Sequence, residues 1–155
     1  MKNTPWLVEE AVIFLDNYLK KNSDANILEY GSGGSTIWFA ERTKNLVSIE
    51  HDSVWFTTVQ QTLKEKNLKA ECYLLPRPYY EKIFEKNRFD LILVDGRDRV
   101  RCVKAIVEKN ILKSGGILML DNSERYWYKP IHEILKDWKV EKYMHEWETS
   151  WWTCK

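Results

Sequence analysis

A chain of 155 residues has the length of one domain, long enough to bury a core and too short for a second folding unit of ordinary size. Its 24 basic and 23 acidic residues are spread along the chain and give a formal net charge of +1. The overall electrostatic field therefore does not favour binding to nucleic acid or to an anionic membrane. The cysteines Cys72, Cys102 and Cys154 are odd in number and lack C-x-x-C spacing, which predicts reduced thiols and a cytoplasmic protein. No run of about 18 apolar residues and no signal-like N-terminus occurs, so we expect neither a membrane span nor secretion.

The N-terminal half alternates helical and strand patterns. Apolar residues at helical spacing predict helices at residues 7–19, 37–40 and 53–66. In the last of these, Trp55, Val59 and Leu63 recur at i, i+4 and i+8 and predict one apolar face. Short apolar stretches predict buried strands at residues 27–30, 46–50 and 70–75.

The C-terminal half continues the alternation. The apolar run between Asp90 and Asp95 is typical of a central parallel strand that is buried on both faces. A second strand is expected at 117–121, and the tail from 140 to 155 is expected to form two strands or a hairpin. Helices are expected at residues 100–111 and 130–138. The whole pattern predicts a single α/β domain over residues 1–155, with a doubly wound, mostly parallel sheet, helices on both faces and an antiparallel C-terminal strand.

The most informative local motif is Leu28-Glu-Tyr-Gly-Ser-Gly-Gly-Ser-Thr36, which follows a predicted strand and opens a predicted helix. Its glycines predict a turn in which a ligand lies against bare backbone. Glu29 ends the strand before this loop, and Glu50 ends the next strand. This layout suits a nucleotide-bearing cofactor.

The motif resembles that of the class I S-adenosylmethionine-dependent methyltransferases. In that superfamily a strand ending in an acid runs into a loop of the form E-x-G-x-G, and an acid at the end of the second strand holds the ribose hydroxyls. Glu29, Gly31 and Gly33 match the loop, and Glu50 matches the ribose acid. The resemblance continues through 89–96 and 114–122, which match the fourth and fifth strands.

The resemblance implies S-adenosylmethionine as the cofactor and methyl transfer to a small-molecule acceptor. Our hypothesis for the acceptor is an oxygen of a saccharide or of another small polar metabolite. The residues expected to bind the cofactor are Glu29, Tyr30, Gly31, Ser32, Gly33, Gly34, Ser35, Glu50, His51 and Asp95. An oxygen acceptor must lose a proton, so Asp95 is the candidate base, with anchoring of the loop or of the cofactor's amino group as its alternative role.

Asp95, Asp121 and Asn122 also resemble the metal triad of the catechol and caffeoyl-coenzyme A O-methyltransferases. The resemblance implies Mg²⁺ or another divalent cation held by oxygen ligands. Asp98, however, stands where the catechol enzymes have a lysine base. Both the metal and a phenolic acceptor therefore stay open.

The segment Arg97-Asp-Arg-Val-Arg101 places cations where a helix is expected to begin, which is electrostatically unfavourable. Either Arg97 or Arg99 receives an anionic group of the substrate, or the loop is held by salt bridges to Asp95, Asp98 or a nearby glutamate. The candidate catalytic residues are therefore Asp95, Asp121 and Arg97. The aromatic segment 126–128 is a candidate lid over the acceptor.

Two other functions fit parts of the sequence. A nicotinamide-dependent oxidoreductase would use the same loop, although Thr36 stands where the third glycine of G-x-G-x-x-G is expected. A non-catalytic S-adenosylmethionine-binding module could dock a partner protein through the aromatic tail 147–152, which is also a candidate homodimer contact.

Overall fold

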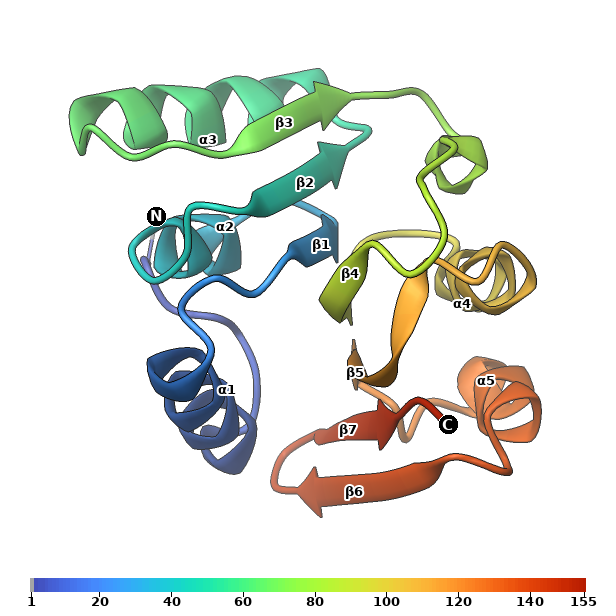
Figure 1. Cartoon of the computed structure of the whole chain (residues 1–155). Coiled ribbons are helices and arrows are strands. Elements are labelled where there is room, and N and C mark those ends of the chain that lie inside the picture. Colours follow the sequence, from blue (N-terminus) through green and yellow to red (C-terminus); the bar gives the residue numbers. More distant parts are fainter. Residues whose placement is uncertain (1) are drawn as a thin grey trace.

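The computed structural model describes residues 2–155 and contains one mixed sheet flanked by helices (Figure 1). The strands are β1 (Ile27–Tyr30), β2 (Leu46–Glu50), β3 (Glu71–Leu74), β4 (Phe89–Val94), β5 (Leu112–Asp121), β6 (Lys139–Met144) and β7 (Glu148–Thr153). The helices are α1 (Glu9–Lys21), α2 (Gly34–Ala40), α3 (Ser53–Glu65), α4 (Arg99–Glu108) and α5 (Lys129–Ile134). Single 3₁₀ turns, η1 (Tyr79–Glu81) and η2 (Tyr126–Tyr128), interrupt two of the connections.

The strand order is β3-β2-β1-β4-β5-β7-β6. Strands β1 to β5 pair in parallel, and β7 runs antiparallel to both β5 and β6. The predicted doubly wound sheet with an antiparallel C-terminal strand is therefore confirmed, as is the hairpin in the tail. The chain winds in one direction from β1 to β3 and in the other from β4 onward, so the switch point lies between β1 and β4. Ligand sites in such sheets lie outside the carboxyl ends of the strands at this point.

The core has a layer on each face of the sheet because side chains alternate along every strand. On β4, Leu91 and Leu93 pack with residues of α1 and α2, whereas Ile92 and Val94 pack with residues of α4 and α5. Figure 1 shows α1 and α2 on one side of the central strands and α4 and α5 on the other. Burial on both faces explains why this strand is an unbroken apolar run.

The aromatic tail is part of the core. Trp151 and Trp152 are 3% and 2% exposed and face opposite layers, and the Trp151 ring stacks on Phe14 of α1 with centroids 4.8 Å apart. These two side chains are therefore not accessible to a partner protein or to a second copy of the chain. Because adjacent strand residues point to opposite faces of the sheet, each of the two tryptophans packs into a different core layer. The tail therefore stabilises the fold.

Two other expectations need correction. The helix expected to run to residue 138 ends at Ile134, and Leu135 packs into the core from the turn that follows. Trp55 was expected to share a buried face with Val59 and Leu63, yet its side chain is 42% exposed while theirs are 1% and 5% exposed. Its position in the first turn of α3 places it at the strand ends.

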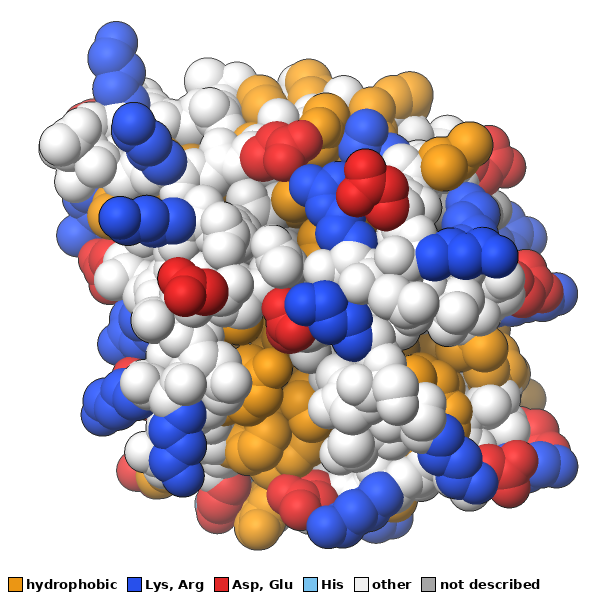
Figure 2. All heavy atoms as spheres, in the orientation of Figure 1, with side chains coloured by type: hydrophobic (Ala, Val, Ile, Leu, Met, Phe, Trp, Pro, Cys, Tyr) orange, Lys and Arg blue, Asp and Glu red, His pale blue; other side chains and the backbone are white. Residues whose placement is uncertain are grey.

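Charges of both signs are interspersed on the face drawn in Figure 2, in keeping with the even charge distribution along the sequence. Among residues 2–155, no helix is long and apolar enough to cross a bilayer.

Candidate functional site

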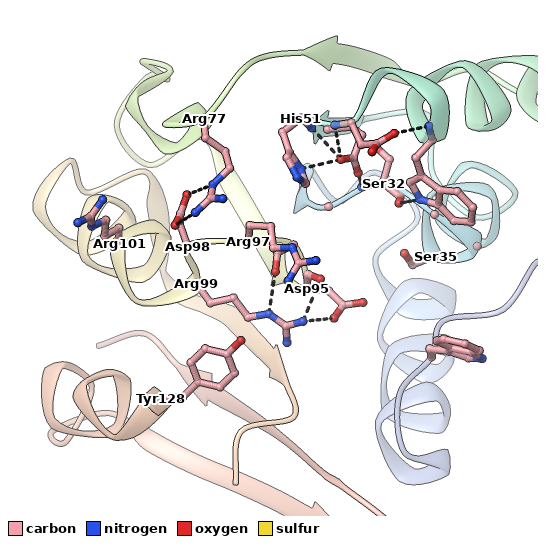
Figure 3. Close-up of a pocket in the computed structure, with 18 of the residues that line it drawn as sticks. Ser32, Ser35, His51, Arg77, Asp95, Arg97, Asp98, Arg99, Arg101 and Tyr128 are labelled. Carbon is pink, nitrogen blue, oxygen red and sulfur yellow. Dashed lines mark hydrogen bonds and ion pairs between the residues drawn. The ribbon is translucent and has the colours of Figure 1, made fainter. Parts of the chain in front are cut away.

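A cavity of about 1310 Å³ opens at the carboxyl ends of β1, β2 and β4, where the strand order reverses. We call this the strand-end cavity (Figure 3). One wall, the glycine side, includes residues 31–35, Glu50, His51, Asp52 and Trp55, and Lys2 lies beside Gly34 on the same side. The opposite wall, the arginine side, comprises Arg97, Arg125, Trp127 and Tyr128, and Asp95 lies between the two walls.

The glycine loop passes very close to the loop after β4. Gly31 has φ +98°, and a Cβ atom at this position would lie 2.6 Å from the backbone of Gly96. Only glycine fits both this left-handed conformation and this approach. A Cβ at Gly34 would lie 2.1 Å from the carbonyl oxygen of Lys2, because the N-terminal segment crosses the start of α2. The loop is therefore fixed between two neighbouring segments.

Glu29 holds the glycine loop from below and does not line the cavity. It is fully buried, and its carboxyl group accepts hydrogen bonds from the hydroxyls of Ser35, Thr36 (2.6 Å) and Ser48 (2.7 Å). Tyr30 is equally buried, at 1% exposure. The two residues were expected to bind the cofactor, but both are buried beneath the glycine loop and neither is among the described residues that line the cavity.

Burial raises the pKa of Glu29 to about 7, although its three hydroxyl donors oppose the rise. A carboxyl group whose pKa is higher in the folded state than in the unfolded state binds more protons when folded, so stability falls as pH rises from about 4.5 to 7. For Glu29→Gln, which cannot titrate, we expect roughly 2 kcal/mol less decline in unfolding free energy between pH 5 and pH 8 than for the unaltered chain. Urea unfolding at several pH values measures this, and parallel curves for the two proteins would contradict the assignment.

Glu50 ties the end of β2 to the glycine loop. One carboxylate oxygen accepts from the backbone N–H of Ser32 at 2.9 Å, and the other accepts from the N–H groups of His51 and Asp52 at 2.8 and 2.9 Å. The His51 ring stacks on Tyr79, with centroids 5.8 Å apart. Glu50 thus lies at the cavity wall with its orientation fixed by the backbone.

Every N–H group from Gly31 to Gly33 already has a partner. Gly31 donates to the carbonyl of Ile49 at 2.9 Å, Ser32 donates to Glu50, and Gly33 donates to the Thr36 hydroxyl at 2.8 Å. Phosphate-binding loops instead aim such groups at their ligand. The backbone N–H groups in the first half of this loop are therefore not free to bind a ligand.

Trp55 is a wall residue that the sequence pattern concealed. Asp52 caps α3 by accepting from the Trp55 N–H at 2.8 Å, and the Trp55 indole donates to the carbonyl of Ser32. The ring therefore stands beside the glycine loop. The signal in the sequence was Asp52 as an N-cap, which places Trp55 in the first turn after the strand end.

Asp95 and Arg99 form an ion pair at the end of β4, with Arg99 Nη2 lying 3.0 Å from Asp95 Oδ1. Arg99 is 9% exposed and also donates to the carbonyl oxygens of Gly96 (3.0 Å), Asp95 (3.1 Å) and Asp121 (2.6 Å). It thereby fastens the end of β4 to the end of β5. Burial raises the pKa of Asp95 to about 7, and its attraction to Arg99 opposes the rise. The Asp95 side chain keeps 27% of its surface exposed, at the cavity.

The expected metal triad is not assembled. Asp121 is 5% exposed, its carboxylate accepts from the Thr149 hydroxyl at 2.8 Å, and burial raises its pKa. Neither Asp121 nor Asn122 is among the described residues that line the cavity, and no group of three acidic, histidine or cysteine ligands converges anywhere in residues 2–155. The Arg99 guanidinium bridges the two strand ends that would have held the ion. The donor set does not fit a divalent cation, and Asp121 loses its proposed catalytic role.

The arginine segment divides between the two roles expected for it. Arg99 is structural, and Asp98 forms a bidentate pair with Arg77 at 2.6 and 2.7 Å. Arg97 is exposed and lines the cavity, and its guanidinium makes no ion pair among the described residues. Salt bridges thus explain Asp98 and Arg99 but leave Arg97 unexplained.

Residues of η2 and Arg125, which precedes it, complete the arginine side. Arg125, Trp127 and Tyr128 line the cavity, and the Arg99 guanidinium lies 5.4 Å from the centroid of the Tyr128 ring. Tyr126 is 75% exposed and is not among the described lining residues. The predicted lid is therefore a cavity wall to which Trp127 and Tyr128 contribute.

No family model matches the sequence, and no match was found among curated proteins. Solved structures are similar. The SAH-bound methyltransferase PaMTH1 of Podospora anserina has a TM-score of 0.72 and 19% sequence identity to this chain. The similarity covers 94% of this chain and 78% of the PaMTH1 chain. The tRNA (m1A58) methyltransferase TrmI of Aquifex aeolicus has a TM-score of 0.71 and 13% sequence identity, and the similarity covers 99% of this chain and 71% of the TrmI chain. A precorrin 8W decarboxylase from Methanobacterium thermoautotrophicum has a TM-score of 0.69 and 17% sequence identity, and the similarity covers 100% of this chain and 96% of the decarboxylase chain.

The fold is that of the class I, Rossmann-like methyltransferases, as the glycine loop and the strand-end acids predicted. The decarboxylase shows that a protein with another stated activity shares it. The activity of this chain therefore has to be argued from its site.

Proposed function

We propose that this chain, which has the class I methyltransferase fold, transfers a methyl group from S-adenosylmethionine to a small polar acceptor, at an oxygen of a saccharide or of another small metabolite. The observation that carries the proposal is the position of Asp95 between the glycine side and the arginine side of one cavity. At about 1310 Å³ the cavity exceeds the usual size of single-ligand sites, so it has room for a cofactor and an acceptor together.

The glycine side suits S-adenosylmethionine better than a nicotinamide dinucleotide. Its N–H groups from Gly31 to Gly33 are already bonded, and Thr36, in place of a third glycine, uses its hydroxyl to do part of this bonding. A pyrophosphate would need those donors, whereas S-adenosylmethionine has no phosphate. Glu50 and Asp52 add negative charge where a positively charged cofactor would lie.

When bound, the cofactor supplies a methyl group on a sulfonium, which a nucleophilic oxygen can displace. The chain has to position the acceptor and remove its proton. Arg99 holds one carboxylate oxygen of Asp95, which leaves the other to accept that proton. A base with a pKa of about 7 is half ionised near neutral pH, where general bases work best.

The first test is calorimetric titration with S-adenosylmethionine and, separately, with NAD⁺. We expect micromolar binding of S-adenosylmethionine alone. Binding to Glu50→Gln should be at least tenfold weaker, because an NH₂ group replaces one of the carboxylate oxygens at the cavity wall and cannot accept a hydrogen bond. Because Glu50 also anchors the loop, the thermal midpoint of the variant has to be compared with that of the unaltered chain. Binding of NAD⁺ instead would favour the oxidoreductase hypothesis, and binding of neither ligand would refute the cofactor proposal.

A further inference from the structure

The two sides of the strand-end cavity differ in charge. Glu50 and Asp52 bring negative charge to the glycine side, where Lys2 also lines the cavity beside Gly34. On the arginine side, Arg97 and Arg125 line the wall, and neither makes an ion pair among the described residues. The arginine side therefore carries two cations that form no ion pair with a described carboxylate.

This positive charge is left over after the neighbouring ion pairs are complete. Arg99 is matched by Asp95, and Arg77 is matched by Asp98 through two hydrogen bonds. Arg97 is exposed despite its place in this charged loop. Helix stability does not explain it either, because a cation just before the first turn of α4 is unfavourable.

Arg97 is two residues from Asp95, in the same loop, and Figure 3 shows both at the open centre of the site. A ligand group held by Arg97 would keep the rest of a small acceptor within reach of the Asp95 carboxylate. Trp127, 58% exposed, adds a flat apolar surface on the same wall, and the Arg125 guanidinium lies 5.8 Å from the centroid of its ring. Guanidinium groups bind carboxylates and phosphates through parallel hydrogen bonds.

We propose that the acceptor is an anionic small molecule, a hydroxyl compound bearing a carboxylate or a phosphate that Arg97 binds with support from Arg125. This inference rests on the proposed methyl transfer and adds the class of substrate to it. Negative charge on the acceptor would complement the arginine side, as the positive charge of the cofactor complements the glycine side. The methyl group and the anion would then lie on opposite sides of the reacting oxygen.

Matched probes test this binding without requiring turnover. The protein saturated with S-adenosylhomocysteine is titrated with glucose 6-phosphate, glucuronate and glucose, and with 4-hydroxybenzoate and 4-hydroxybenzamide. We expect at least one anionic probe to bind about 10- to 100-fold more tightly than its neutral counterpart, as hydrogen bonds to a charged group imply. Comparison of glucose 6-phosphate with glucuronate separates phosphate from carboxylate.

Arg97→Met is expected to reduce the preference for the anionic probe to less than threefold. Arg97→Lys keeps the charge but loses the paired N–H groups of the guanidinium, so its preference should be intermediate. The matched control is Lys104→Met, which removes a cation from the exposed side of α4, outside the cavity, and should leave the preference unchanged. Affinity for S-adenosylhomocysteine should stay within threefold in all three variants.

The inference is overturned if no anionic probe binds more tightly than its neutral counterpart, or if Arg97→Met keeps the preference. Either result with intact S-adenosylhomocysteine binding leaves the proposed methyl transfer standing. Failure of the unaltered chain to bind S-adenosylhomocysteine would instead refute the proposed function itself.

Discussion

Replacement of Arg99 by methionine is expected to lower the free energy of unfolding at pH 7.5 by about 3 kcal/mol. The physical reason is that the Arg99 guanidinium donates to carbonyl oxygens at the ends of both β4 and β5 and pairs with Asp95. Methionine fills part of the volume but leaves these acceptors without a donor, and removing one partner of a buried pair is costly. Urea unfolding measures the loss.

The deficit of Arg99→Met should depend on pH. Without the guanidinium, the pKa of Asp95 rises further, so the folded state binds its proton over a wider range and loses stability more steeply as pH rises. The difference from the unaltered chain should therefore be smaller at pH 5.5 than at pH 8. Lys104→Met, on the same helix, should change stability by less than about 0.5 kcal/mol. A loss below about 1 kcal/mol for Arg99→Met would mean that the bridge between the strand ends contributes little.

Asp95→Asn should have the largest effect on turnover. If Asp95 is the base, kcat falls by about 100- to 10,000-fold, because the amide cannot accept the proton of the acceptor. The rate of the unaltered chain should rise with pH and level off above about 7, where the carboxyl group is ionised, and this rise should be absent from the variant. Initial rates of methyl transfer to an anionic probe that binds, measured from pH 5.5 to 8.5, test both points.

The same variant separates the two roles considered for Asp95. A base acts on the acceptor, so the dissociation constant of S-adenosylmethionine should change by less than threefold in Asp95→Asn. If the residue anchors the cofactor's amino group instead, that constant rises by at least tenfold, as expected when a charged hydrogen-bond partner is lost, while kcat at saturation changes little.

Local patterns in the sequence were sufficient for most of the fold. Alternation of helical and strand periodicity predicted the doubly wound sheet, because in a parallel sheet each crossover helix needs one apolar face and each central strand needs two. Ser32, Glu50, Asp95 and Arg97, which were candidate site residues from the sequence, all line one cavity, since the carboxyl ends of parallel strands meet there. The resemblance of the glycine loop to that of the class I methyltransferases indicated residues Gly31 to Ser35, and all five line the cavity.

Contacts between distant segments decided the rest. Asp121 stands opposite Thr149 of β7, 28 positions later in the chain, and their hydrogen bond turns the carboxylate away from the cavity. Arg99 reaches across two strand ends, and Trp151 and Trp152 fill opposite core layers. Sequence spacing fixes which residues reach the same edge of the sheet. It does not fix which partner each side chain meets there, because that depends on strand register and on hydrogen bonds between elements that come together only in the folded chain.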